Sequence, residues 1–147
     1  MRPLMPIVSR AGICVLVLAL SFGCELAAGE QVAVVSVKSS VTTLTKDQVA
    51  DIFLGKASRF PDDSPAVPID QLEGSAARDE FYFKFAGKSP AQVKAHWSKI
   101  IFTGRGQPPR EVSNGIEARK RVAENPNAIG YIDSGMVDGS VRMLPAN

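Results

Sequence analysis

The chain has 147 residues, of which 45% are hydrophobic, enough for one folded domain. Its 17 basic and 15 acidic residues give a formal net charge of +2, and they form no basic run. Aromatic residues make up only 7% of the chain and fall mostly within helical patterns. Charge and aromatic content therefore argue against a protein that binds nucleic acid.

Residues 1–29 have the pattern of a secretory signal peptide. Two arginines frame a positive start, and an apolar run at residues 11–20 is too short to span a bilayer comfortably. Small residues follow at Ala27, Ala28 and Gly29. We expect cleavage near Ala28 or Gly29, which leaves residues 30–147 as a single domain exported to a bacterial periplasm.

Both cysteines, Cys14 and Cys24, lie in this leader, so we expect neither a disulfide nor a free thiol in the mature domain. Gly23-Cys24 is also a pattern of lipoprotein processing, in which Cys24 would become the lipidated first residue. Ser21 stands where such sites usually carry Leu. Lipid anchoring through Cys24 is therefore the alternative to simple cleavage.

The rest of the sequence alternates between strand and helix patterns. Runs of apolar and β-branched residues predict strands at 31–37, 66–69, 128–132 and 141–144. Capped amphipathic segments predict helices at 45–55, 76–85, 90–101 and 115–124, and a short helical turn at 133–137. Gly and Pro predict surface loops at 56–65 and 103–110. This order indicates an α/β domain with a sheet of three or four strands and helices on both faces.

Helix starts are the best specified local structures. Thr45-Lys-Asp-Gln48 and Ser89-Pro-Ala-Gln92 are capping boxes, in which the first side chain and the fourth exchange hydrogen bonds with backbone amides. The helix at 115–124 begins after Ser113 or Asn114, and Glu117 completes a capping box with Asn114.

The stretch 67–78 carries the candidate binding site. A strand leads into Gly74, which permits a tight turn, and Ser75 then caps a helix whose first residues are Ala76 and Ala77. A strand, a glycine turn and a helix start direct free backbone N–H groups towards an anion. The alternative is that Ser75 only caps the helix.

Other polar groups give no catalytic, metal or cofactor site. The Asp62-Asp63 pair is typical of a solvated turn rather than a cation site. His96, the only histidine, has no second histidine or cysteine for a metal and no recognisable nucleophile beside it. The glycine-rich loop at 103–110 matches no P-loop, because no Gly-Lys-Ser or Gly-Lys-Thr occurs in the chain.

Four segments, in order, resemble the phosphate-binding proteins that feed ABC importers. They are the helix start and Leu-Gly-Lys corner at 45–56, the strand and Gly-Ser turn at 71–77, the helix start Ser113-Asn114-Gly115, and the strand Pro126-Asn-Ala-Ile-Gly-Tyr131. The resemblance implies a single lobe of a type II periplasmic-binding-protein-like fold. It covers nearly the whole mature chain but about half of such a protein.

The resemblance also assigns roles to individual residues. Gly74 matches the turn glycine and Ser75 the serine that contacts phosphate, with the N–H groups of Ala76 and Ala77 completing the cradle. Glu73 replaces the aspartate that accepts a proton from hydrogen phosphate.

Two positions depart from the pattern: Gln71 stands where the family has its arginine, and Ala77 where a second hydroxyl belongs. Arg78, Arg105 and Ser113 are candidates to assist the anion and restore the missing charge.

Two functions follow as hypotheses. The first is a binding domain for a small oxyanion, phosphate being the leading candidate, that works with a membrane importer or sensor, or with a second copy of itself that supplies the other wall. The second is a periplasmic interaction or structural protein that kept the fold and lost the ligand, which Gln71 and Ala77 favour. An enzyme is a distant third.

Overall fold

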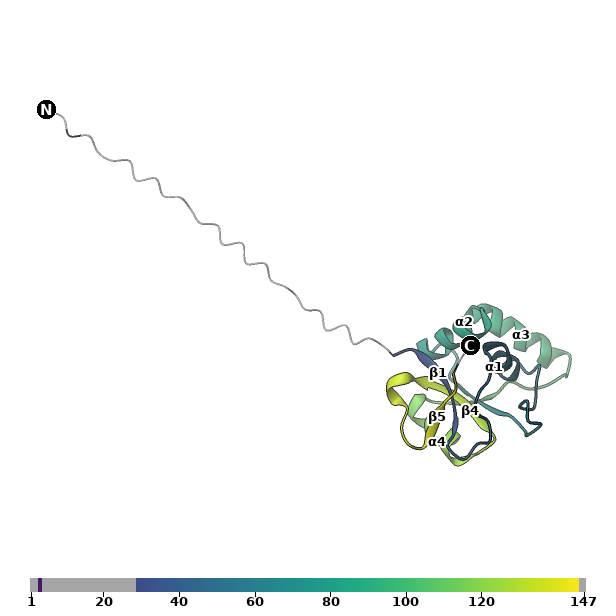
Figure 1. The fold of residues 1–147 in the computed structure, drawn as a ribbon. Helices are drawn as coiled ribbons and strands as arrows, with labels where there is room; N and C mark the ends of the chain where they lie inside the picture. Colours follow the sequence, from purple (N-terminus) through teal and green to yellow (C-terminus); the bar gives the residue numbers. More distant parts are fainter. Residues whose placement is uncertain (1–2, 4–28, 146–147) are drawn as a thin grey trace.

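A computed structural model describes residue 3 and residues 29–145 (Figure 1), so Cys14 and Cys24 lie outside the described residues. The described chain folds around one mixed sheet with the strand order β3-β2-β4-β1-β5. β2 runs parallel to β3 and to β4, and β1 runs antiparallel to β4 and β5. The strands are β1 (Gln31–Ser36), β2 (Val67–Gln71), β3 (Arg110–Val112), β4 (Ala128–Asp133) and β5 (Val141–Met143).

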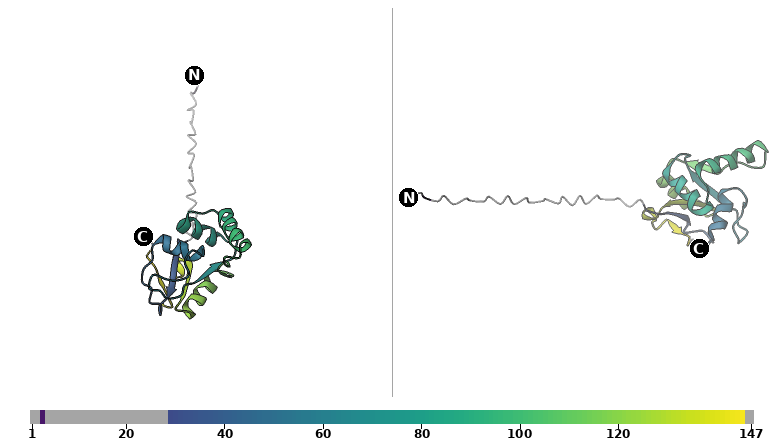
Figure 2. Two further views of the ribbon diagram at one scale, coloured as in Figure 1. Left: turned by 90° about the vertical axis from the view of Figure 1, so that its right-hand side faces the viewer. Right: turned by 90° about the horizontal axis from the view of Figure 1, so that it is seen from above.

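Helices cover both faces of this sheet (Figures 1 and 2). They are α1 (Lys46–Phe53), α2 (Ala76–Ala86), α3 (Pro90–Phe102) and α4 (Gly115–Glu124), with a short 3₁₀ turn η1 (Ser134–Met136). Side chains of α1, α2 and α3 pack on one face and those of α4 on the other, because alternate residues of β1 and β4 point in opposite directions. The α/β class with helices on both faces is confirmed.

The predicted caps are present. The Thr45 hydroxyl accepts a hydrogen bond from the Gln48 amide at 3.2 Å, while the Gln48 side chain accepts one from the Thr45 amide at 2.9 Å. Ser89 and Gln92 make the same pair of bonds at the start of α3. Asn114, not Ser113, caps α4, but Glu117 does not complete the predicted capping box, because its carboxylate accepts from the Ser113 amide and not from the Asn114 amide. These starts form where the sequence placed them because a cap needs only residues three apart in the chain.

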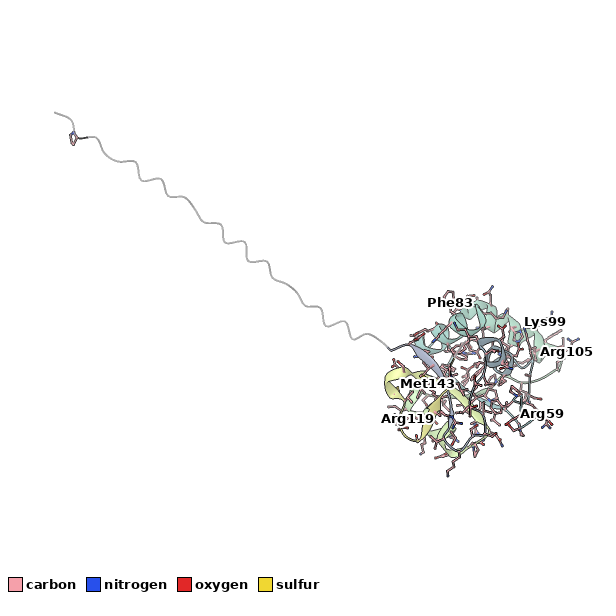
Figure 3. The ribbon with its side chains drawn as sticks, in the orientation of Figure 1. Arg59, Phe83, Lys99, Arg105, Arg119 and Met143 are labelled. Atoms are coloured by element: carbon pink, nitrogen blue, oxygen red, sulfur yellow. The ribbon has the colours of Figure 1, made fainter. Side chains whose placement is uncertain are left out.

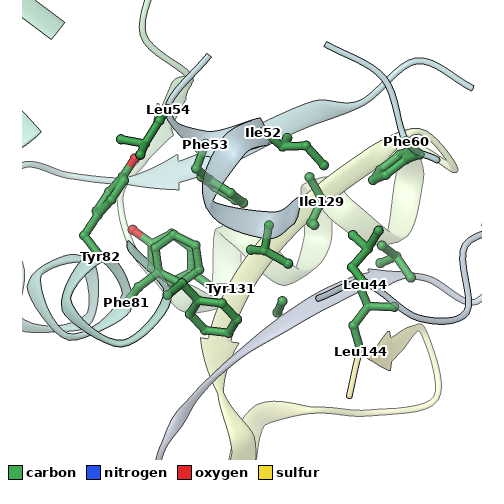
Figure 4. Packing of buried hydrophobic residues seen from close by; sticks show 14 of the residues in the cluster. Leu44, Ile52, Phe53, Leu54, Phe60, Phe81, Tyr82, Ile129, Tyr131 and Leu144 are labelled. Carbon is green, nitrogen blue, oxygen red and sulfur yellow. The ribbon is translucent and has the colours of Figure 1, made fainter. Parts of the chain in front are cut away.

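An aromatic cluster fills the larger half of the core, between the sheet and α1 and α2 (Figure 4). The rings of Phe81 and Tyr131 stack with centroids 3.9 Å apart, and Phe53 meets Phe81 edge-on at 4.7 Å. On the other face, Val122 of α4 lies against Gly130, where an added Cβ would come within 2.8 Å of its methyl group. Gly130 therefore lets α4 approach β4 closely.

The sheet has five strands, where three or four were predicted. Residues 110–112 pair in parallel with β2, so that Gln71 lies opposite Val112. Arg110 was expected to belong to a loop, and a three-residue edge strand with one buried residue is too short to show a period. Among the described residues, no helix is both long and apolar enough to cross a membrane.

Candidate functional site

Three parallel strands end at the same edge of the sheet and lead into helices. β2 ends at Gln71 before α2, β3 ends at Val112 before α4, and β4 ends at Asp133 before η1. Ligands of open α/β sheets bind outside the carboxyl ends of the strands. The predicted Gly74–Ala77 turn and Ser113 therefore share the edge at which this type of fold binds ligands.

The start of α2 is open to water. Gly74 has a φ of 88°, and an added Cβ there would meet nothing within 4 Å. Ser75 caps the helix, its hydroxyl accepting from the Arg78 amide at 3.3 Å. Among the described residues, no acceptor outside the helix bonds the amides of Ala76 and Ala77, and Ala76 is exposed. The mouth of α2 is thus neither plugged by side chains nor turned into the core.

Arg78 does not supply charge to this mouth, contrary to our expectation. Its side chain is 10% exposed, and its guanidinium lies 3.1 Å from Glu111 and 3.6 Å from the buried Asp70. Burial lowers the pKa of Arg78, but the surrounding groups, Asp70 first among them, together raise it more, so the net shift is upward. One turn into the helix, the side chain points towards β2 and β3 instead of past the helix end.

The remaining predicted residues are also engaged. Glu73 pairs with Lys94 at 3.5 Å, and both side chains are largely exposed. The Ser113 amide donates to the Glu117 carboxylate at 2.9 Å, and this bond is the main reason why the pKa of Glu117 is lowered. Arg105 lies in the loop after α3 and lines a different hollow, beside His96. The fold brings Gly74–Ala77 and Ser113 to one edge but does not direct Arg78 or Arg105 to it.

Gln71 is buried and bound to the core. Its side-chain amide donates to the Tyr131 carbonyl at 2.9 Å, and its backbone amide donates to Asp70 at 2.8 Å and to the Tyr131 hydroxyl at 3.1 Å. The phosphate-binding proteins that the sequence resembles have an arginine at this position. In this chain the side chain at the same position holds β2 to β4.

Asp70 is the centre of a polar network that sequence reasoning missed. Its side chain is 1% exposed and accepts hydrogen bonds from the hydroxyls of Tyr82, at 2.6 Å, and Tyr131. Burial is the first cause that raises the pKa of both tyrosines, and the Asp70 charge adds to it. Each hydroxyl therefore remains protonated and donates to the carboxylate. The one available signal was an acidic residue at the end of an apolar strand.

A pocket of about 220 Å³ lies next to this network, between α2, α3 and β3. Arg78 and Glu111 line its polar side. Its apolar walls are Tyr82, Pro90, Val93, Trp97, Ile101 and Pro108. Gly74–Ala77 do not line it, so the pocket is distinct from the mouth of α2.

His96 and Asp62, in which the sequence indicated no catalytic or metal site, have structural roles in the described part of the chain. A ring nitrogen of His96 lies 2.7 Å from the Leu54 carbonyl, which ties α3 to the end of α1. Asp62 accepts from the Ser64 hydroxyl within its turn and from the Ser40 hydroxyl, 22 residues earlier in the chain. Over the described range, no group of three or more His, Cys, Asp or Glu side chains could hold a metal ion.

Comparison with known proteins shows which solved structures share this fold. No family model and no curated protein matches the sequence. Among solved structures, a phosphate ABC transporter substrate-binding protein with bound phosphate from Clostridium perfringens matches 80% of this chain with a TM-score of 0.63 and 25% identity. The described domain has the fold of part of the phosphate ABC transporter substrate-binding proteins.

Two further solved structures share this fold. An ABC-type phosphate transport receptor from Vibrio cholerae matches 80% of the chain with a TM-score of 0.64 and 22% identity. PstS from Borrelia burgdorferi matches 81% with a TM-score of 0.57 and 19% identity. The chain spans 45%, 46% and 47% of the length of these three proteins, less than half of each.

Proposed function

We propose that this domain binds a small oxyanion, with phosphate as the leading candidate, at the start of α2. Gly74 and Ser75 form the turn, and the amides of Ala76 and Ala77 donate to the anion. The observation that carries the proposal is that, among the described residues, no acceptor outside the helix bonds these two amides, which lie at the carboxyl edge of parallel strands in a fold shared with phosphate-binding proteins.

The affinity expected of this site is modest. Helix N-terminal amides supply only partial charge, and Arg78 is neutralised by its two carboxylates. The Lys94 ammonium pairs with Glu73, which precedes Gly74 in the chain, so its charge is also compensated. Salt should weaken binding at such an exposed site, and a second wall, from another copy or a partner protein, would strengthen it by excluding water.

Replacing Ala76 tests the site without disturbing the helix. Ala76 is the first helical residue, where proline fits, and Ser75 already has the extended backbone that precedes proline (φ −73°, ψ 142°). Ala76→Pro removes one proposed donor and should abolish phosphate binding in calorimetry at low salt, with the melting temperature unchanged or raised. Ala76→Ser keeps the amide and is the matched control, expected to bind like the wild type.

The same titrations decide the proposal as a whole. The wild-type domain is titrated with phosphate, sulfate and nucleotides, and its melting temperature is measured with each. Absence of heat and of any thermal shift with all of them would refute oxyanion binding. Binding that survives in Ala76→Pro would place the anion elsewhere on the domain.

We further propose that residues 1–29 export the domain to the periplasm, where it works with a membrane importer or sensor. The support is the leader pattern in the sequence and the likeness to ABC transport proteins. Cell fractionation tests the location. A Cys24→Ala variant distinguishes cleavage from lipid anchoring, because only a lipoprotein would lose its membrane attachment.

A second function, capture of an acidic partner protein, is favoured by the surface of α3 and its neighbours. Residues 81–110 contain no acid and six basic residues, Lys84, Lys88, Lys94, Lys99, Arg105 and Arg110. Figure 3 shows Lys99 and Arg105 towards one end of the domain, and Phe102 at the end of α3 is 93% exposed. This function predicts partner capture that Ser75→Ala leaves unchanged and Phe102→Ser abolishes.

A further inference from the structure

The pocket between α2, α3 and β3 has the features of a second binding site. Its volume of about 220 Å³ exceeds that of a buried cavity of about 150 Å³ that holds a benzene ring. Val93 and Trp97 of α3 form one wall and are almost fully buried, at 3% and 6% exposure. These side chains are fixed by the core, so the wall is preformed and suits an apolar group of about the size of one ring.

The polar side of the pocket has an excess of negative charge. Its lining includes three acids, Glu73, Asp79 and Glu111, against two bases, Arg78 and Lys94. Asp70 lies behind Arg78 at 3.6 Å and adds a fourth carboxylate, so four acids face two bases and the formal sum is −2.

The two bases are already paired within this group. Arg78 is held between Asp70 and Glu111, and Lys94 pairs with Glu73. Among the described residues, Asp79 has no ion-pair partner, and the Glu111 side chain is 39% exposed at the edge of the pocket. A positively charged group in the pocket would therefore meet one unpaired carboxylate and one partly paired carboxylate, while an anion would meet repulsion.

We propose that this pocket binds a small organic cation that carries a single aromatic or branched apolar group next to an ammonium group. The apolar group packs between Trp97, Val93 and Pro108, and the ammonium lies between Asp79 and Glu111. The site uses none of the amides proposed to bind the oxyanion, so either function stands or fails without the other.

Trp97 provides the measurement, because it is the only tryptophan in the chain and it lines the pocket. The fluorescence of the wild-type domain is followed while phenethylamine, 2-phenylethanol or 3-phenylpropionate is added. These probes have a similar apolar group and differ in charge. We expect a saturable change with the amine, weaker binding of the alcohol and the weakest binding of the carboxylate. No saturable change with the amine, or a carboxylate that binds as tightly, would overturn the proposal.

Two variants test whether Asp79 and Glu111 cause the preference for the amine. Asp79→Asn and Glu111→Gln should each weaken amine binding by about two- to fivefold, the range for one partly exposed ion pair, and leave the alcohol unaffected. Glu124→Gln removes an exposed acid at the end of α4, on the opposite face of the sheet, and should change neither. Glu111→Gln also alters the partner of Arg78 and could destabilise the domain. If Glu111→Gln does not fold, Asp79→Asn alone tests the charge preference. Unchanged amine binding in Asp79→Asn and in any folded Glu111→Gln would refute the proposal.

Discussion

Replacing Asp70 with Asn should lower the free energy of unfolding by about 3 kcal/mol. Asp70 is buried, accepts from Tyr82 and Tyr131, and lies 3.6 Å from the Arg78 guanidinium. Removing one partner of a buried ion pair costs about 3–5 kcal/mol, because the other charge stays buried without its counterion. Arg78 keeps Glu111 at 3.1 Å, which places the expected loss at the lower end of that range.

Urea unfolding followed by circular dichroism measures this loss, and the melting temperature should fall by roughly 10 °C for a domain of this size. The asparagine has nearly the volume of the aspartate, so the change reports charge and hydrogen bonding rather than a cavity. Asp79→Asn, in the first turn of α2 and without an ion-pair partner among the described residues, is the matched control, expected within about 0.5 kcal/mol of the wild type. If Asp70→Asn were equally neutral, the network would not contribute to stability and the reasoning would fail.

Two further predictions concern the same core. The pKa of both tyrosines, Tyr82 and Tyr131, is raised in the folded state, first by burial and then by the Asp70 charge. The contribution of these two tyrosines to stability should therefore be constant below about pH 10, and above it stability should fall by about 2.7 kcal/mol per pH unit, because the unfolded chain releases two protons that the folded chain keeps. Urea unfolding across this range measures the slope, and Tyr82→Phe should halve it; tyrosinate absorbance appearing before unfolding would contradict the assignment. Gly55 and Gly87 both have positive φ, 74° and 62°, but an added Cβ at Gly55 would lie 2.8 Å from the Trp97 ring, while at Gly87 it would meet nothing within 4 Å. Gly55→Ala should therefore lower the free energy of unfolding by about 1–3 kcal/mol more than Gly87→Ala does, as measured by thermal unfolding. Equal losses would show that the Trp97 ring moves aside without cost.

The helix starts were predictable because the groups that form a cap lie within one turn of the chain. Thr45 with Gln48, and Ser89 with Gln92, bond as their spacing indicated. The aromatic face of α2 was predictable for a similar reason, since Phe81 and Phe85 are four residues apart and share one side of the helix.

The polar network was not predictable, because its members come together only through the sheet. Asp70 and Tyr131 are 61 residues apart, and Arg78 and Glu111 are 33 apart. Parallel pairing of β2 with β3 sets Asp70 opposite Glu111, and the same pairing assigns Arg78 to two carboxylates instead of to an anion. Periodicity in one segment carries no information about such a partner.

The sequence by itself determined the helix starts, the strand–turn–helix at Gly74 and Ser75 and the α/β class, because each depends on neighbours along the chain. Tertiary structure decided which side chains surround that turn. It left the amides of Ala76 and Ala77 without an acceptor outside the helix among the described residues and directed Arg78 inwards. It also formed, from α2, α3 and β3, a pocket with apolar walls and an acidic polar side. The physical reason is that charge and shape at a site are sums over all the elements that meet there, whereas a cap or a turn is complete within a few residues.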